Sequence, residues 1–248
     1  MILVIDVGNT QTCLAIYEPN NNEAICHWRA STQKNVTVDE LASRLLNLLS
    51  KSDFKLQTIS SIVISCVVPS LAVVYEKCAT SLIKSRGYDT KVVVCNAQNA
   101  KKLDPKIYDC KYIHPNEVGS DIIASCIAAR TLHTTPCAII DFGTATNINV
   151  LNKEGEFVGA VIAPGMKTSL DALISDAGAL SEIELKIPNK VIGNSTSSLI
   201  QSGAIIGEAC RADGLIDKIE EELGYPISVI CTGGWSKLLH TEMKHETI

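Results

Sequence analysis

The sequence predicts an α/β protein made of two similar halves. A glycine-containing motif occurs twice, because residues 6–12 read DVGNTQT and residues 141–147 read DFGTATN. Each copy follows an apolar run and continues into two further apolar segments, a pattern typical of a strand, a tight loop, a second strand, a turn and a third strand. With 248 residues and 46% hydrophobic content, the chain can form one large domain or two smaller ones. The duplicated motif favours two.

In the first half, predicted strands at residues 2–5 and 13–17 flank the first loop, and a third strand follows a turn at residues 19–22. Thr37 to Glu40 has the form of a capping box, and leucines follow at helical spacing, so we expect a helix over Val38 to Leu49. The remaining elements are a buried strand, an amphipathic helix, a short strand and a polar connection containing proline, at residues 61–67, 71–82, 91–95 and 96–119.

After a first helix, the second half repeats the three opening strands. Its elements are a helix, three strands, two helices and a last strand, expected at residues 121–132, 137–140, 148–151, 157–162, 167–175, 197–223 and 229–231. Pro164 and Gly165 mark a break after the third strand, and an irregular stretch separates the last two helices. Gly203 and Gly207 indicate either tight packing or a helix break. The polar tail after Leu239 is expected to be frayed.

Both glycine loops have the composition of a phosphate-binding site. A glycine two residues after an aspartate lets the backbone turn sharply, and the N–H groups of such a loop form an anion nest. Asp6 and Asp141 end apolar strands, where a carboxylate can hold a hydrated magnesium ion or orient a water. The neutral side-chain donors near the loops are Asn9, Thr10, Thr12, Thr144 and Thr146. Two such loops facing one another would form a cleft for a polyphosphate, although a single Asp-x-Gly-Asn is also an ordinary turn signal.

Composition narrows the classes of function. The net charge of −5, with scattered lysines and arginines, argues against a nucleic-acid partner. None of the ten cysteines lies in a Cys-x-x-Cys pair and most sit in apolar runs, so we expect small buried hydrophobes in a reducing cytosol. No apolar run approaches ~18 residues and Asp6 interrupts the first one early, so a cytoplasmic protein with no membrane partner is expected.

The motifs resemble the actin-like (ribonuclease H-like) ATPase fold of actin, the sugar kinases and the heat-shock chaperone ATPases. In that fold each half has a central mixed sheet flanked by helices. Within the superfamily the chain is most similar to type III pantothenate kinase, and the most diagnostic stretch is residues 115–121, PNEVGSD. The resemblance implies an N-terminal half, 1–115, with the first phosphate loop. It also implies a C-terminal half, 116–248, with the second phosphate loop and an adenosine-side loop at Thr232-Gly233-Gly234.

The resemblance further implies an activity, the phosphorylation of pantothenate to 4′-phosphopantothenate by ATP, at the entry to coenzyme A synthesis. The cofactors would be Mg²⁺, held in part by Asp6, and a monovalent cation, K⁺ or NH₄⁺, at Asp141. Asp121 would be the general base that accepts the proton of the substrate hydroxyl. The residues implied for ATP phosphates are Asp6, Val7, Gly8, Asn9, Thr10, Gln11, Thr12, Cys13 and Thr144. Those implied for the substrate are Tyr112, Gly119, Ser120, Asp121, Ile122 and Thr196.

Two positions depart from the family pattern. Ile122 stands where the family has arginine, and an aliphatic side chain cannot replace a guanidinium. Lys111 and Arg130 are the nearest cations in sequence. Asn147 replaces a common threonine, a milder change. The chain could therefore be a catalytically degenerate, nucleotide-binding regulatory relative, or a kinase for another small hydroxy acid.

Alternative roles also remain for two of the substrate residues and for the helix after Asp121. Tyr112 could be a bland surface aromatic, and Thr196 could cap a helix that starts at Ser197. The family is dimeric, so a homodimer is expected, yet the Ile- and Ala-rich helix after Asp121 could equally pack against its own core.

Overall fold

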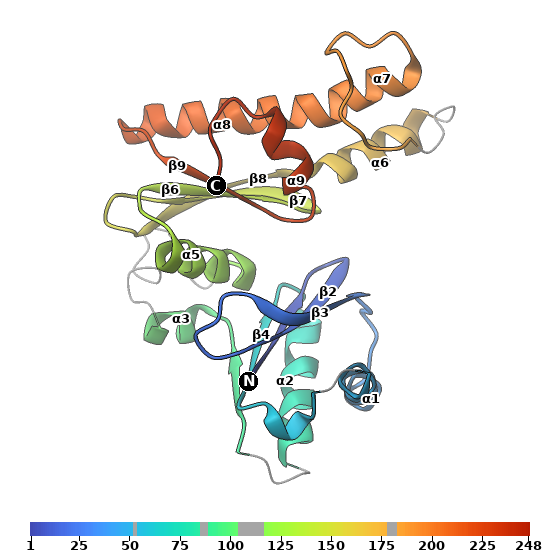
Figure 1. The fold of residues 1–248 in the computed structure, drawn as a ribbon, viewed down its shortest axis with the longest axis vertical. Coiled ribbons are helices and arrows are strands. Elements are labelled where there is room, and N and C mark those ends of the chain that lie inside the picture. The colour runs from blue at the N-terminus through green and yellow to red at the C-terminus, as the bar shows by residue number, and fades with distance from the viewer. Residues whose placement is uncertain (52–53, 85–88, 104–116, 178–182) are drawn as a thin grey trace. The chain divides into compact units, whose positions relative to one another are not determined.

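The structure is a computed structural model that describes residues 1–51, 54–84, 89–103, 117–177 and 183–248. The described residues form two compact units, of which the first ends at Ala124 and the second begins at Ser125. Each unit has one mixed sheet with helices packed against it, as Figure 1 shows for each unit by itself. The predicted α/β class with a duplicated sheet is therefore confirmed.

The first unit contains a five-stranded sheet in the order β3-β2-β1-β4-β5. The strands are β1 (Ile2–Val7), β2 (Gln11–Tyr17), β3 (Ala24–Ser31), β4 (Ser61–Cys66) and β5 (Lys91–Val94). The first three form an antiparallel meander, and β4 runs parallel to β1. This parallel pairing sets Asp6 directly beside Ser65.

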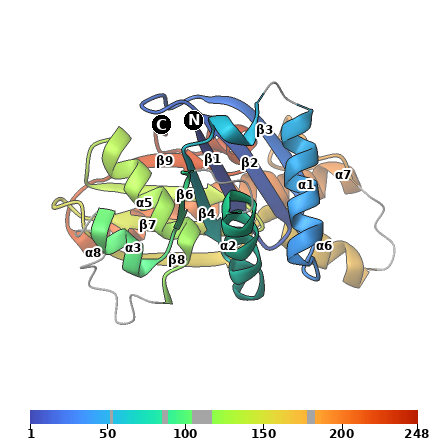
Figure 2. The same ribbon diagram turned by 90° about the horizontal axis from the view of Figure 1, so that it is seen from below.

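Helices α1 (Val38–Ser50) and α2 (Pro69–Lys84) lie over one face of this sheet, as Figure 2 shows, and share a buried apolar core with it. The predicted capping box is present, because the Thr37 hydroxyl accepts from Glu40 N and the Glu40 carboxylate accepts from Thr37 N. Pro69 opens α2, a position that suits proline because the first helical N–H has no partner within the helix. A short 3₁₀ turn covers Leu56–Thr58.

The second unit contains a four-stranded sheet in the order β8-β7-β6-β9. The strands are β6 (Cys137–Phe142), β7 (Ala145–Leu151), β8 (Phe157–Pro164) and β9 (Ser228–Thr232). Strands β6, β7 and β8 repeat the antiparallel meander of the first unit, and β9 pairs parallel with β6 as β4 does with β1. The duplication seen in the sequence is thus a duplication of strand pairing.

Several helices of the second unit contribute to the apolar core that covers this sheet. The helical elements of this unit after β8 are α6 (Met166–Ala177), α7 (Thr196–Gln201), a π-helical segment (Ser202–Ile206), α8 (Gly207–Leu223), α9 (Ser236–Leu239) and a 3₁₀ turn (His240–Glu242). Helix α8 runs along the sheet in Figure 1 and buries Ala212 and Ile216 against it. Helix α5 (Ser120–Leu132) contains the division between the two units and buries Ile123, Cys126 and Ala129.

Three expectations about the elements are corrected. Helix α3 (Ala97–Leu103) begins the stretch predicted as a polar connection containing proline. Gly203 and Gly207 are expected to mark either tight packing or a helix break. Among the described residues, no neighbouring atom lies within 4 Å of the positions where their Cβ atoms would stand, which excludes tight packing, and the α-helical pattern is interrupted there by a π-helical segment, Ser202–Ile206.

The C-terminal tail is anchored rather than frayed. Asp213 of α8 accepts hydrogen bonds from the backbone N–H groups of Lys244 and His245, at 2.7 and 3.1 Å. Ile248 N donates to Val229 O and Cys231 N donates to Ile248 O, which adds the chain end to the edge of β9. A polar tail is held here because a buried carboxylate needs donors.

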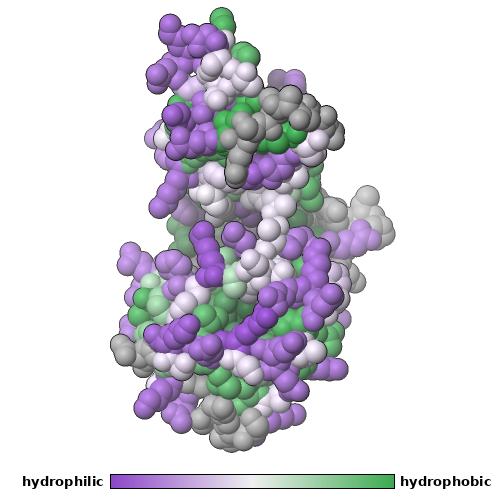
Figure 3. Space-filling view, turned by 90° about the vertical axis from the view of Figure 1, so that its right-hand side faces the viewer, coloured by the Kyte–Doolittle hydropathy of each residue, from purple (hydrophilic) through white to green (hydrophobic). Residues whose placement is uncertain are grey.

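Hydrophilic side chains are spread over the face shown in Figure 3, with apolar residues between them. Among the described helices, none is long and apolar enough to cross a bilayer. The nine described cysteines are free thiols, of which Cys78, Cys126 and Cys137 are buried and Cys210 is exposed.

Candidate active site

The first glycine loop joins β1 to β2 in a tight turn. Gly8 N donates to Gln11 O at 2.9 Å, and a Cβ atom on residue 8 would stand 2.9 Å from the same oxygen. Only glycine allows this close approach without displacing the backbone. Asn9 and Thr10 at the tip are exposed, so the loop offers polar groups to a ligand.

The side chain of Thr12 points inward rather than toward the loop tip. It is 4% exposed, and its hydroxyl lies 2.9 Å from that of Thr32, which donates to Gly8 O at 2.8 Å. Thr32 N also donates to Thr10 O. The hydrogen bonds of Thr12 and Thr32 therefore stabilise the conformation of the first glycine loop. Thr32 was missed by the sequence reasoning, because it lies after the motif and meets it only through the pairing of β2 with β3.

Asp6 lies at the carboxyl end of β1 in an unfavourable electrostatic environment. Its pKa is raised, first because the surrounding protein reduces the solvation of the carboxylate, although the residue as a whole stays exposed. A hydrogen bond from Ser65 opposes this shift, and the negative charge of Asp121 adds to it. Asp6 and Asp121 are thus close enough to repel one another.

A pair of buried serines ties the start of α5 to the end of β4. The Ser120 hydroxyl accepts from Cys66 N at 2.9 Å and lies 3.2 Å from the Ser65 hydroxyl, and both serines are 8% exposed. Ser65 in turn bonds Asp6. Together, Asp6, Ser65, Ser120 and the Cys66 N–H form one polar network.

Asp121 occupies the first turn of α5, directly after this anchor. Its Oδ1 accepts from Ile122 N at 2.8 Å. A Cβ atom on Gly119 would overlap this same oxygen, so only glycine leaves room for the carboxylate in this conformation. Gly119 and Ser120, both implied as substrate residues by the resemblance, also fix the position of Asp121.

Cys95 lies against the same network. Its thiol is 3.4 Å from Ser120 O and donates to it. Burial, together with the charges of Asp121 and Asp6, raises the pKa of the Cys95 thiol to about 11. The thiol is therefore neutral at physiological pH and remains a donor.

The second glycine loop lies in the second unit, and three glycines allow chain segments to meet there. Gly143 N donates to Ala145 O at 3.0 Å, as Gly8 does in the first loop. A Cβ atom on Gly165 would overlap the carbonyl oxygen of Gly143. Gly233, at φ +94°, has no space for a side chain because Asp141 Oδ1 and the backbone of Phe142 fill it.

This arrangement brings Asp141 beside the Thr232-Gly233-Gly234 segment after β9. Trp235 N donates to Phe142 O at 3.1 Å, and Gly165 N and the Thr168 hydroxyl both donate to Thr144 O, at 3.0 and 2.6 Å. Thr144 itself is exposed. The geometry is that of a backbone cradle with one carboxylate, suited to phosphate oxygens and a cation.

Comparison with known proteins shows which family has a chain with these two glycine loops. The family model described as type III pantothenate kinase matches residues 2–218. The chain belongs to the type III pantothenate kinase family.

Individual relatives are similar in sequence along nearly the whole chain. The type III pantothenate kinase of Halalkalibacterium halodurans is 36% identical over 245 residues, which cover 98% of this chain and 91% of the relative. That of Desulfosudis oleivorans is 35% identical over 240 residues, covering 96% and 89%.

Solved structures show the fold class. A propionate kinase from Francisella tularensis has a TM-score of 0.52 at 12% identity, with 97% of this chain and 85% of that chain covered. An acetate kinase from Porphyromonas gingivalis has a TM-score of 0.52 at 11% identity, covering 97% and 84%. The predicted actin-like ATPase fold is confirmed.

Membership in this kinase family implies the use of ATP with a divalent metal ion, and the residues present fit such an ion. Asp6 offers carboxylate oxygens, the ligands that Mg²⁺ prefers, and the charge of Asp121 lies nearby. Their mutual repulsion and the poor solvation of Asp6 are costs that a nearby dication would remove.

Ile122, which stands where the family has arginine, and the cations nearest to it in the sequence lie in different surroundings. Ile122 is half-buried on α5. Arg130 is eight residues further along that helix, about 12 Å by helical rise, and its guanidinium packs against Gly155 of the turn between β7 and β8. Arg130 therefore does not replace the missing arginine beside Asp121. Lys111 and Tyr112 lie outside the described residues.

Thr196 is the first residue of α7 and is exposed. The cap of this helix is Ser195, whose hydroxyl accepts from Ser198 N at 3.3 Å. The alternative role of Thr196 as the helix cap is thus wrong, and its hydroxyl faces solvent.

A buried charge network supports the second loop and was not predicted. Glu208 of α8 is 5% exposed and accepts from the Thr146 hydroxyl at 2.5 Å. Arg211 pairs with both Glu208 oxygens, at 2.7 and 2.6 Å, and donates to Pro164 O. Thr146 is therefore a structural residue of the loop rather than an exposed phosphate donor. The i, i+3 spacing of Glu208 and Arg211 was visible in the sequence, but the partner on β7 was not.

Proposed function

We propose that the protein transfers the γ-phosphoryl group of ATP to the 4′-hydroxyl of pantothenate. The observation that carries this proposal is the position of Asp121 in the first turn of α5, tied through Ser120 and Ser65 to Asp6. A hydroxyl is a poor nucleophile, and a fixed carboxylate that accepts its proton contributes about 10²–10⁴-fold to the rate. The membership of the chain in the type III pantothenate kinase family supports pantothenate as the substrate.

The proposed reaction is a single displacement. The Asp121 carboxylate accepts the hydroxyl proton, the substrate oxygen forms a bond to the γ-phosphorus, and the bond from that phosphorus to ADP breaks. Asp6 would hold Mg²⁺, which when bound would neutralise part of the charge of the phosphates. The chain itself contributes by aligning the two reacting groups.

The roles of the loops follow from their donors. The N–H groups and exposed polar side chains of Asn9 and Thr10 bind ATP phosphates, and Thr144 is a further phosphate contact by the family resemblance. Asp141, enclosed by Gly143 and Gly233, binds a monovalent cation, K⁺ or NH₄⁺. Its partial enclosure by backbone supports this role, because carbonyl oxygens and a single carboxylate suit a low-charge cation.

The pantothenate pocket is proposed to include Gly119, Ser120, Asp121 and Ile122 at the start of α5, with Tyr112 and Thr196. Thr196 lies on α7 near exposed apolar side chains, with Leu199 57% and Ile192 88% exposed. Such exposure is costly in water. It supports the proposal that the chain acts as a homodimer in which this region is covered.

The direct test is an assay of purified protein with ATP, Mg²⁺, a potassium salt and pantothenate, in which phosphopantothenate is measured by mass spectrometry. We expect a product that requires all four additions. A panel of other small hydroxy acids serves as the control for substrate identity, because preference for another acid in the panel would reassign the substrate.

Ile122 favours a second candidate, a nucleotide-binding relative without catalysis. Such a protein would bind ATP in a calorimetric titration but would give no heat with pantothenate and no product. An Ile122→Arg variant separates the two functions. If only the variant forms phosphopantothenate, the natural site is degenerate.

A further inference from the structure

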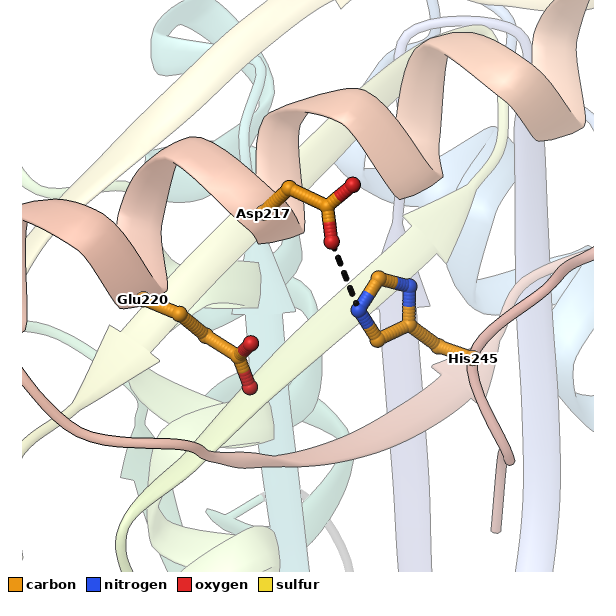
Figure 4. A group of neighbouring side chains, drawn as sticks. All are labelled: Asp217, Glu220 and His245. Atoms are coloured by element: carbon orange, nitrogen blue, oxygen red, sulfur yellow. Dashed lines mark ion pairs between the residues drawn. The ribbon is translucent and has the colours of Figure 1, made fainter.

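A cluster of metal-ligating side chains lies on the second unit and has no part in the proposed kinase site. Asp217 and Glu220 are one turn apart on α8, and His245 comes from the C-terminal tail. One ligand atom from each lies within 4.8 Å of the others. Figure 4 shows the three side chains pointing toward one another from these two segments.

The imidazole ring of His245 is oriented by a buried carboxylate. Its Nδ1 lies 2.8 Å from Asp213 Oδ1, and Asp213 is 8% exposed. The same carboxylate accepts from the backbone N–H groups of Lys244 and His245. Because an ionised carboxylate can only accept, Nδ1 carries a proton, and in the neutral ring the lone pair is on Nε2. Metal-binding histidines are held by the same carboxylate arrangement.

The lone pair of Nε2 points at another acceptor. Nε2 lies 3.2 Å from Asp217 Oδ1, the contact drawn in Figure 4. Two lone pairs cannot face one another at this distance without a positive charge, so either a second proton or a metal cation must lie there. Two ligand atoms about 2.0–2.1 Å from one tetrahedral Zn²⁺ stand about 3.3 Å apart. The observed separation fits a shared metal ion.

The local charge also fits a dication. Three carboxylates meet at the cluster, those of Asp213, Asp217 and Glu220, and Lys244 Nζ lies 3.6 Å from Asp217 Oδ2. Glu220 is held in place by Ile227 N, which donates to its Oε1 at 2.9 Å. The Asp217 side chain is 46% exposed, which leaves a solvent path for an ion.

We propose that His245 Nε2, Asp217 and Glu220 bind a divalent transition-metal ion of the Zn²⁺ class, with solvent completing the coordination. One nitrogen and two carboxylate ligands are typical of such ions. Asp213 is the positioning residue. The ion would join the C-terminal tail to α8 and so stabilise the chain end that pairs with β9.

The test uses Co²⁺ as a spectroscopic probe on the full chain after treatment with a chelator. We expect one Co²⁺ per chain, with visible absorption and without the charge-transfer band that cysteine thiolates give. His245→Gln and Glu220→Gln should each weaken Co²⁺ binding at least tenfold. Glu220→Gln keeps an oxygen that can accept from Ile227 N, so the tail contact and the fold are retained.

Glu221→Gln and His240→Gln are the matched controls, because they remove the same groups from neighbouring exposed positions. Both should bind Co²⁺ as the natural chain does. Saturating Zn²⁺ should also raise the thermal midpoint of the natural chain but not that of His245→Gln. Absence of stoichiometric Co²⁺ binding, or equal binding by His245→Gln, would overturn the proposal and leave the contact as a protonated ion pair.

Discussion

Replacing Ser120 by alanine tests how the start of α5 is held. The hydroxyl is 8% exposed and bonds both Cys66 N and the Ser65 hydroxyl. Its removal leaves the Cys66 N–H without this acceptor, and a buried unsatisfied donor costs about 1–3 kcal/mol. We expect the free energy of unfolding to fall by that amount in urea denaturation.

The same substitution should slow the reaction. Ser120 precedes Asp121 directly, and a displacement of a reacting group by about 1 Å can cost about 10²-fold in rate. We therefore expect Ser120→Ala to lower kcat by about 10–100-fold while calorimetry shows an unchanged Kd for nucleotide.

Thr131→Ala is the control on the same helix. Thr131 is exposed, and its hydroxyl donates to Ile127 O of the same helix at 2.8 Å. Its loss should change stability by less than about 0.5 kcal/mol and leave kcat unaltered. If Ser120→Ala behaves like this control in both assays, the serine network does not position Asp121.

Three further substitutions test other parts of the site. Asp6→Asn should raise the free energy of unfolding at pH 7 while lowering kcat. The pKa of Asp6 is raised in the folded chain, so the contribution of this carboxyl group to stability is complete at acid pH and is lost as pH rises through the folded-state pKa. The stability gained by the variant should therefore vanish when urea unfolding is measured below that pKa. Gly119→Ala should lower kcat with little effect on nucleotide Kd, because the added methyl group displaces the Asp121 carboxylate; unchanged kinetics would show that the loop accommodates it. Arg211→Leu leaves the Glu208 charge buried without its cation and should destabilise the chain by about 3–5 kcal/mol, measured by urea unfolding, whereas a loss below about 1 kcal/mol would mean that solvent reaches Glu208.

Local patterns in the sequence predicted the elements whose signals lie within a few residues. The capping box at Thr37 and Glu40 specified where α1 begins, because both of its hydrogen bonds join residues three positions apart. Gly8 and Gly143 specified the two tight loops for the same reason. The family resemblance extended these local predictions to a fold.

Features that depend on distant partners were not accessible in this way. Helix α3 is only seven residues long, and its buried face is formed by small residues such as Ala97 and Ala100, which give a weak apolar pattern. The Asn96 side chain, which accepts from Asn99 N at 2.9 Å, lies at its start. The tail is fixed by Asp213 of α8, which lies some thirty residues before Lys244 and His245 in the sequence, and no local pattern joins them. Thr12 and Thr146 carried the right chemistry for phosphate, but their hydroxyls bond Thr32 and Glu208 instead.

The most direct test of the central claim, that Asp121 is the base in pantothenate phosphorylation, is the turnover of Asp121→Asn measured beside nucleotide binding by calorimetry. Asparagine keeps the size and one oxygen of the side chain but cannot accept the proton. We predict that phosphopantothenate formation falls by about 10²–10⁴-fold while the Kd for nucleotide stays the same. Turnover equal to that of the natural chain would remove Asp121 from this role and contradict the proposed mechanism.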